Sequence, residues 1–208
     1  MKKFFIITAL LLITVNCEKK VEKDLVLENF TSIKDEIAQI GQYGTDDQLK
    51  NLFFNCMMFC NDADFDSKLN DLASAGFSEN KWDEFNAYIK NFTPVIKVVV
   101  TEDAVYMSPD TGYFLQKSEP DSVSQKFFTL AEEGWYDSDL SSLQLGKEIW
   151  PVWLDGETGK FLPKKGKDSV KKWEKLKSDL DDIYFEVADR TITELNNEID
   201  LANQKSNG

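Results

Sequence analysis

The sequence predicts an α+β protein with an N-terminal helical group, a small antiparallel sheet of two hairpins, and a long C-terminal helix. Three observations carry this prediction. Apolar residues recur at helical spacing before residue 93, β-branched runs and turn residues occupy 94–163, and no Gly or Pro interrupts 169–204. We therefore expect a single domain over residues 30–208, with a helical part at 30–93, a sheet part at 94–163 and a long helix at 168–204.

Residues 30–93 carry the clearest helical signals. Thr45 and Gln48 have the spacing of a capping box, in which each side chain bonds to the backbone of the other residue. Asp66 and Ser78 are each placed to cap a shorter helix, the first ending at Gly76. Behind the capping box runs an apolar stripe along one helical face, made of Leu49, Leu52, Phe53, Cys56, Met57 and Cys60.

Two hairpins are expected in the sheet part. Val95–Thr101 is β-branched and apolar, and residues 104–107 and 113–116 flank the turn residues 108–112. Residues 149–154 and 160–162 flank a second turn at 155–159. Pro151 lacks a backbone donor, so it indicates an edge strand or a bulge.

The last segment has an apolar stripe that changes register. The first part runs from Val170 to Val187, and the second runs from Ala188 to Ile199. One long helix would fit this pattern, and so would two helices with a joint near Asp189. The sustained spacing also allows an oligomer built on coiled-coil pairing of this segment.

The first residues have the features of an export signal. Lys2 and Lys3 precede an apolar run of 12 residues from Phe4 to Val15. A membrane-spanning helix needs about 20 apolar residues, so a transmembrane anchor is disfavoured. The run ends at Cys17, and a charged stretch follows at once.

The sequence Thr14-Val15-Asn16-Cys17 resembles the end of a bacterial lipoprotein signal peptide. This resemblance covers residues 1–17 only, and it implies that 1–16 is a removed signal peptide and that Cys17 is the lipidated N-terminus. Residues 17–29 would then form a solvated tether between the membrane and the domain. Ordinary cleavage, which would release a secreted soluble protein, is the alternative.

Composition and charge exclude several classes of function. The net charge is −13, which disfavours nucleic acid as a partner because phosphate binding depends on Lys and Arg. The chain contains no histidine, which rules out Ser-His-Asp and Cys-His catalysis within it. Asp62, Asp64 and Asp66 alternate as in a calcium loop, but the required Gly and Glu positions hold Ser67 and Ala73. We expect no metal and no cofactor.

Cys56 and Cys60 are the remaining cysteines once Cys17 is lipidated. In an exported protein such a pair suggests a disulfide. Helical neighbours at this spacing have Cβ atoms about 5–6 Å apart, whereas a disulfide needs about 3.5–4.5 Å. Two buried thiols in the core stripe are the other interpretation, and the sequence leaves both open.

A candidate contact surface combines aromatic and basic residues. Trp150 and Trp153 lie in the second hairpin, and one of them is expected to be exposed. Lysines cluster at the start of the last helix, and we take Lys164, Lys165, Lys167, Lys171 and Lys172 as members of the surface. These lysines could instead face the acidic remainder of the protein.

These observations predict an exported bacterial lipoprotein of the cell envelope with a binding or structural role. Its expected partners are a membrane, through the N-terminal lipid, and an envelope protein or glycan. The alternative from another class is a carboxylate-based hydrolase of envelope glycans or peptides. A cleft lined by two carboxylates would favour the hydrolase, and a shallow aromatic patch beside the lysines would favour binding.

Overall fold

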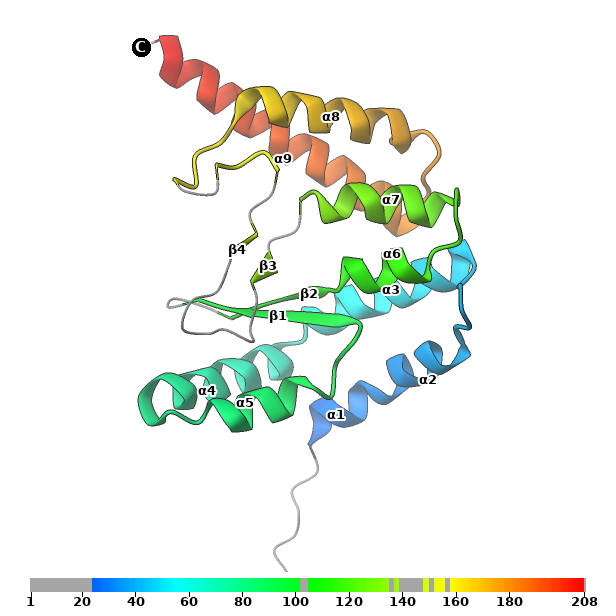
Figure 1. Ribbon diagram of the computed structural model, residues 1–208, viewed down its shortest axis with the longest axis vertical. Helices are drawn as coiled ribbons and strands as arrows, with labels where there is room; N and C mark the ends of the chain where they lie inside the picture. Colours follow the sequence, from blue (N-terminus) through cyan, green and yellow to red (C-terminus); the bar gives the residue numbers. More distant parts are fainter. Residues whose placement is uncertain are drawn as a thin grey trace, which may run out of the picture.

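The computed structural model describes residues 24–101, 105–134, 137–138, 148–149, 152–155 and 158–207, and it has an α+β fold (Figure 1). The N-terminal helical group, the small antiparallel sheet and the long C-terminal helix are all present. The helices are α1 (Leu25–Asn29), α2 (Thr31–Gln39), α3 (Asp46–Cys60), α4 (Ala63–Glu79), α5 (Trp82–Ile89), α6 (Thr111–Lys117), α7 (Val123–Glu132), α8 (Pro163–Lys177) and α9 (Asp182–Asn207). The strands are β1 (Ile96–Val100), β2 (Val105–Pro109), β3 (Asp137–Ser138) and β4 (Glu148–Ile149).

The fold begins earlier than expected, within the predicted tether. Asp24 caps α1 by accepting a hydrogen bond from the backbone N–H of Leu27 at 3.2 Å. Val26 is buried, and Leu27 packs against the core. The prediction of a solvated tether over 17–29 is therefore wrong for residues 25–29, because they form a helix whose Val26 and Leu27 side chains join the core.

Helix α3 follows its sequence pattern closely. Thr45 and Gln48 form the expected capping box, with reciprocal hydrogen bonds of 3.2 and 3.0 Å. Leu49, Leu52 and Phe53 are completely buried. The stripe ends on Phe59 rather than on Cys60, which is only partly buried.

The two short helices predicted after α3 are arranged differently. Asp62, not Asp66, caps α4, and its carboxylate accepts hydrogen bonds from the backbone of residues 64 and 65. Gly76 lies inside α4 rather than at its end. The Trp82 ring occupies the space that a side chain at Gly76 would need, since a Cβ atom there would lie 2.6 Å from the ring. Ser78 is also inside α4, where its hydroxyl donates to the Ser74 carbonyl.

The first hairpin forms, but with different residues. Strands β1 and β2 pair in an antiparallel register that sets Val98 opposite Met107. The predicted strand at 113–116 is wrong, because Asp110 accepts a hydrogen bond from the backbone of Tyr113 and starts α6. The turn chemistry around Asp110 therefore caps a helix instead of reversing a strand.

The second hairpin is reduced to a single bridge between Leu154 and Phe161. Its turn is as expected: Asp155 accepts hydrogen bonds from Thr158, and Gly159 adopts a positive φ of 64°. Residues 149–154 do not form one strand, since Glu148–Ile149 pairs instead with Asp137–Ser138. Pro151 lies outside the described residues.

The C-terminal segment is two helices, so the expectation of one helix over 168–204 is wrong. Helices α8 and α9 lie side by side, and the chain reverses at residues 178–181 rather than near Asp189 (Figure 1). Buried Leu180 fills the reversal, and Asp182 has a positive φ of 46°. Lys50 of α3 forms ion pairs with Asp181 at 2.6 Å and with Asp182 at 3.2 Å. The register change between Val187 and Ala188 lies inside α9, so it does not mark the reversal.

Within the described residues, no helix combines the length and the apolar character needed to cross a membrane.

Replacing Asp46 by Asn should lower stability in a pH-dependent way. The Asp46 carboxylate accepts a 2.9 Å hydrogen bond from the backbone N–H of Ser124. Burial by itself raises the pKa of Asp46, but hydrogen bonds from Ser124 and Val123 and the charge of Lys50 outweigh burial and lower the pKa below 3.8. A depressed folded pKa stabilises the fold above the unfolded pKa, and this contribution is lost as the pH falls through the folded value.

We therefore expect Asp46→Asn to lower the free energy of unfolding by about 0.5–1.5 kcal/mol at pH 7. The difference from wild type should shrink below about pH 4, the usual range of an Asp pKa. Urea unfolding at several pH values measures this difference in the free energy of unfolding between the variant and wild type. Asp47→Asn is the matched control, since the Asp47 side chain is 89% exposed. An Asp46→Asn effect that does not depend on pH contradicts the assignment.

Candidate functional site

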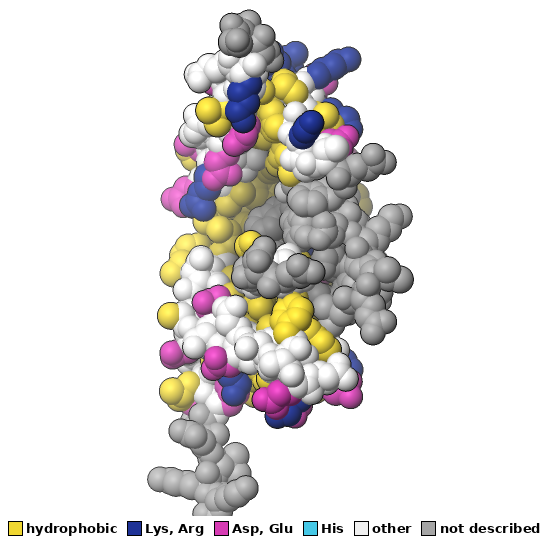
Figure 2. Space-filling view, turned by 90° about the vertical axis from the view of Figure 1, so that its left-hand side faces the viewer, with side chains coloured by type: hydrophobic (Ala, Val, Ile, Leu, Met, Phe, Trp, Pro, Cys, Tyr) yellow, Lys and Arg dark blue, Asp and Glu magenta, His cyan; other side chains and the backbone are white. Residues whose placement is uncertain are grey.

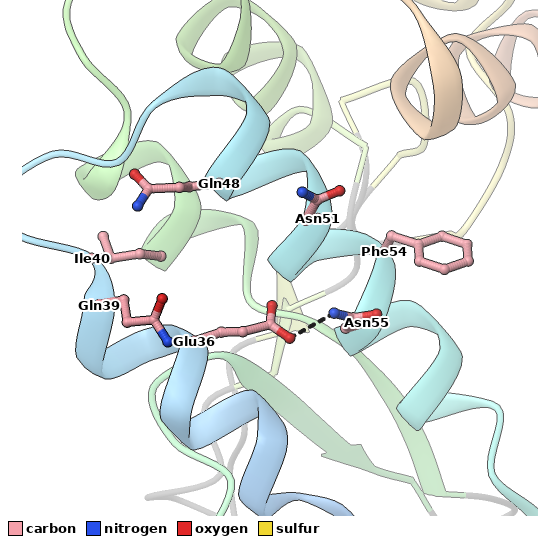
Figure 3. Close-up of a pocket in the computed structure, with 7 residues that line it drawn as sticks. All are labelled: Glu36, Gln39, Ile40, Gln48, Asn51, Phe54 and Asn55. Atoms are coloured by element: carbon pink, nitrogen blue, oxygen red, sulfur yellow. Dashed lines mark hydrogen bonds between the residues drawn. The ribbon is translucent and has the colours of Figure 1, made fainter.

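A groove between α2 and α3 collects polar side chains from both helices (Figure 3). Its volume is about 350 Å³. This size lies at the lower end of the range typical of small-molecule sites. We call it the amide groove; its lining residues are Glu36, Gln39, Ile40, Gln48, Asn51, Phe54 and Asn55.

The hydrogen bonds inside the amide groove hold some side chains in place and leave others open. Asn55 donates to the Glu36 carboxylate at 2.7 Å and so links the two helices (Figure 3). The Gln48 carbonyl oxygen is occupied by the capping box, which leaves its amide N–H groups available. Among the described residues, the side-chain amides of Gln39 and Asn51 have no partner. The groove therefore presents both donors and acceptors to a ligand.

The charge of the amide groove is low for so acidic a protein. Glu36 is its one ionisable lining residue, and no Lys or Arg lines it. Phe54 is 45% exposed, and Figure 3 shows its ring at the opposite end of the groove from Gln48. Neutral amide donors and acceptors beside an accessible aromatic ring suit a ligand with many hydroxyl groups and no net charge.

Neither the amide groove nor a second cavity beside α9 has, among its described lining residues, the carboxylate pair that a glycosidase-type mechanism needs. Glu36 is the one carboxylate of the amide groove, and Glu194 is the one carboxylate of a cavity beside α9. Within the described ranges, no group of three His, Cys, Asp or Glu residues could hold a metal ion. The hydrolase alternative gains no support from these cavities.

The described members of the predicted contact surface are Trp153 and the five lysines of α8. Trp153 packs with Phe161 against Val170, Leu195 and Ile199 on α8 and α9. Trp150 lies outside the described residues. The five lysines, which are Lys164, Lys165, Lys167, Lys171 and Lys172, occupy exposed positions of α8. The ring of Trp153 is therefore part of the packing between elements.

Lys172 of this set, and Lys177 at the end of α8, face acidic residues. Lys172 forms an ion pair with Glu133 at 2.7 Å, and Lys177 pairs with Asp189. Both pairs join α8 to a neighbouring element. Each is exposed, so its contribution to stability is at most about 1 kcal/mol.

Cys56 and Cys60 are both free thiols in the structure, on an uninterrupted α3. Burial raises the pKa of Cys60 to about 12. Burial raises the pKa of Cys56 as well, and the nearby Cys60 and Glu36 raise it further. Neither thiol is activated as a nucleophile or as a metal ligand.

The amide groove is not among the sites that the sequence predicts. Its signal is nonetheless present, because Gln48, Asn51 and Asn55 recur at helical spacing on one face of α3. What the sequence alone does not show is that α2 turns Glu36 and Gln39 toward this face.

Comparisons of the chain with protein-family models, with curated proteins and with solved structures found no match.

We expect Cys56 and Cys60 to resist alkylation in the folded protein at pH 8. The reason is that burial and the raised pKa values leave very little thiolate. In denaturant without a reductant, both cysteines should be labelled by N-ethylmaleimide, as measured by peptide mass spectrometry. Labelling that appears only after a reductant is added would show a disulfide instead.

Proposed function

We propose that this chain is an exported bacterial lipoprotein, anchored to a membrane through Cys17, whose domain has a binding role in the cell envelope. The export and lipidation parts rest on the resemblance of residues 1–17 to a lipoprotein signal. The amide groove is the observation that supports binding. Its unpaired amides, its low charge and its exposed ring favour an uncharged glycan as the ligand.

The position of α1 determines how a lipid on Cys17 would orient the domain. Helix α1 lies at one end of the long axis, and α8 with the end of α9 lies at the other (Figure 1). Asp24 is the seventh residue after Cys17, and the backbone between the two, fully extended, spans at most about 25 Å. A lipid on Cys17 would therefore hold the α1 end close to the membrane and direct the lysines of α8 away from it.

This orientation bears on the role of the α8 lysines. Electrostatic attraction to lipid headgroups falls off within a Debye length, which is about 8 Å at physiological salt. Lysines at the far end of the molecule are therefore poorly placed to bind the membrane that carries the anchor. They are better placed for another envelope component, which is the second partner class that we propose.

The lipid anchor can be tested by intact mass spectrometry of the protein isolated from cell envelopes. We expect the mass of residues 17–208 plus acyl groups. A Cys17→Ser variant should lose the acyl mass and the fractionation with membranes, while its far-UV circular dichroism stays unchanged. An unacylated mature wild-type chain would contradict lipidation and favour a secreted protein.

Glycan binding by the amide groove can be tested by titration calorimetry of the full-length protein in detergent with an N-acetylglucosamine oligosaccharide. The double variant Gln39→Ala/Asn51→Ala removes two amides that have no described partner and should weaken binding about tenfold, since each neutral hydrogen bond contributes about 0.5–1.5 kcal/mol. Asn197→Ala, at an exposed position of α9, is the matched control and should bind like wild type. Equal affinities of the double variant and the control, or no binding by wild type, would refute the groove as a glycan site.

A further inference from the structure

A second cavity, of about 280 Å³, lies where α7, α8 and α9 meet. Met57 of α3 and Trp153 complete it, and we call it the α9 cavity. Figure 2, turned by 90° from Figure 1, shows hydrophobic side chains in a hollow at mid-height of the molecule. The lining residues are Met57, Leu130, Ala131, Gly134, Trp153, Trp173, Val187, Arg190, Thr191 and Glu194.

Close packing holds the aromatic walls of the α9 cavity in place. A Cβ atom on Gly134 would lie 2.3 Å from the Trp153 ring, so the ring rests directly on the α7 terminus. The backbone on either side of this ring is also bonded: Val152 donates to Glu133, and Leu162 donates to Trp153, each at 2.8 Å. Trp173 is buried and packs edge-on against Phe127 with ring centroids 5.6 Å apart. The cavity is therefore formed before any ligand arrives.

The polar residues of the α9 cavity all come from one face of α9. Arg190 is the only arginine in the sequence, and no described carboxylate forms an ion pair with it. Glu194 follows one turn later and likewise has no described cation as a partner. Thr191 lies between them, and its hydroxyl donates to the Val187 carbonyl, which leaves its oxygen able to accept.

Arg190 and Glu194 present opposite charges to the same small space. Their Cβ atoms are about 5–6 Å apart, as for any helical neighbours at this spacing. A guanidinium binds a carboxylate through two parallel hydrogen bonds, and a carboxylate with a neighbouring hydroxyl accepts from an ammonium group. A ligand that carries only one charge would pair with one of these two residues. It would leave the other residue without a partner and place a like charge beside it.

We infer that the α9 cavity binds a free α-amino acid with an apolar or aromatic side chain. Arg190 holds its carboxylate, Glu194 and Thr191 hold its ammonium group, and its side chain lies among Trp153, Trp173 and the apolar residues of α3 and α7. This inference does not rest on the amide groove or on the lipid at Cys17.

Titration calorimetry of the full-length protein in detergent, against a micelle blank, tests the inference with three probes. L-Phenylalanine carries both charges, 3-phenylpropionate lacks the ammonium group and 2-phenylethylamine lacks the carboxylate. We expect each single-charge probe to bind about tenfold more weakly than L-phenylalanine or worse, because a hydrogen bond to a charged group contributes about 1.5–3 kcal/mol.

Two variants assign the charges to residues. Arg190→Met should weaken L-phenylalanine about tenfold and leave 2-phenylethylamine unchanged, whereas Glu194→Gln should weaken L-phenylalanine and leave 3-phenylpropionate unchanged or tighter. Lys126→Met and Glu198→Gln, at exposed positions outside the cavity, are the matched controls and should bind all probes like wild type.

Three outcomes would overturn the inference. Wild-type protein that does not bind L-phenylalanine refutes it directly. Binding of 3-phenylpropionate as tight as that of L-phenylalanine would show a site for simple carboxylates instead. Equal effects of Arg190→Met and Lys126→Met would remove Arg190 from the site. The double variant Gln39→Ala/Asn51→Ala should bind L-phenylalanine normally, so failure of the glycan site and failure of this site are distinguishable.

Discussion

The ring of Phe53 on α3 contacts the rings of Phe114, Phe127, Phe128 and Tyr184, with centroids 5.3–6.0 Å apart. These rings come from α6, α7 and α9, so one buried side chain joins the N-terminal helices to the C-terminal pair. The pairs are mostly edge-to-face, a geometry that contributes about 0.5–1.5 kcal/mol per pair beyond the burial of area. Phe53 itself is completely buried. Both cavities lie beside elements that this cluster positions: α3 forms one side of the amide groove, and α7 with α9 encloses the other cavity.

Polar interactions around this cluster determine how α9 sits on α3 and α7. The hydroxyls of Tyr184 and Ser124 are 3.0 Å apart and both residues are buried, so each hydroxyl satisfies the other. Burial raises the pKa of Tyr184, which keeps its phenol neutral and able to donate. Asp46 binds the backbone of Ser124, and Lys50, one turn further along α3, binds the carboxylates that open α9. Arg190 follows Tyr184 on the same helix, so these contacts also set its position.

The sequence correctly predicted the parts of the fold that depend on interactions between residues close together in the chain. The capping box at Thr45 and the stripe through Phe53 depend on residues three or four apart, and both were predicted correctly. The errors arose at residues whose type is compatible with two local structures. Asp110 suits a turn and a helix cap equally, and only the contacts of α6 decide between them. The reversal at Leu180 was missed because neither Gly nor Pro marks it. The same reasoning applies to the sites. The amides of α3 are visible as a spacing, but the pairing of Asn55 with Glu36, and of Trp153 with Gly134, joins residues distant in sequence.

The charge of the chain limits what either cavity can take up. A protein with a net charge of −13 repels anions over distances longer than any single contact, and this lowers their local concentration at a binding site. This repulsion does not lower the local concentration of a neutral glycan or of a zwitterionic amino acid, because neither carries net charge. A simple carboxylate would meet the repulsion of the whole surface and then of Glu194, with only Arg190 to offset it. The long-range field and the local residues of both cavities therefore favour ligands without net charge.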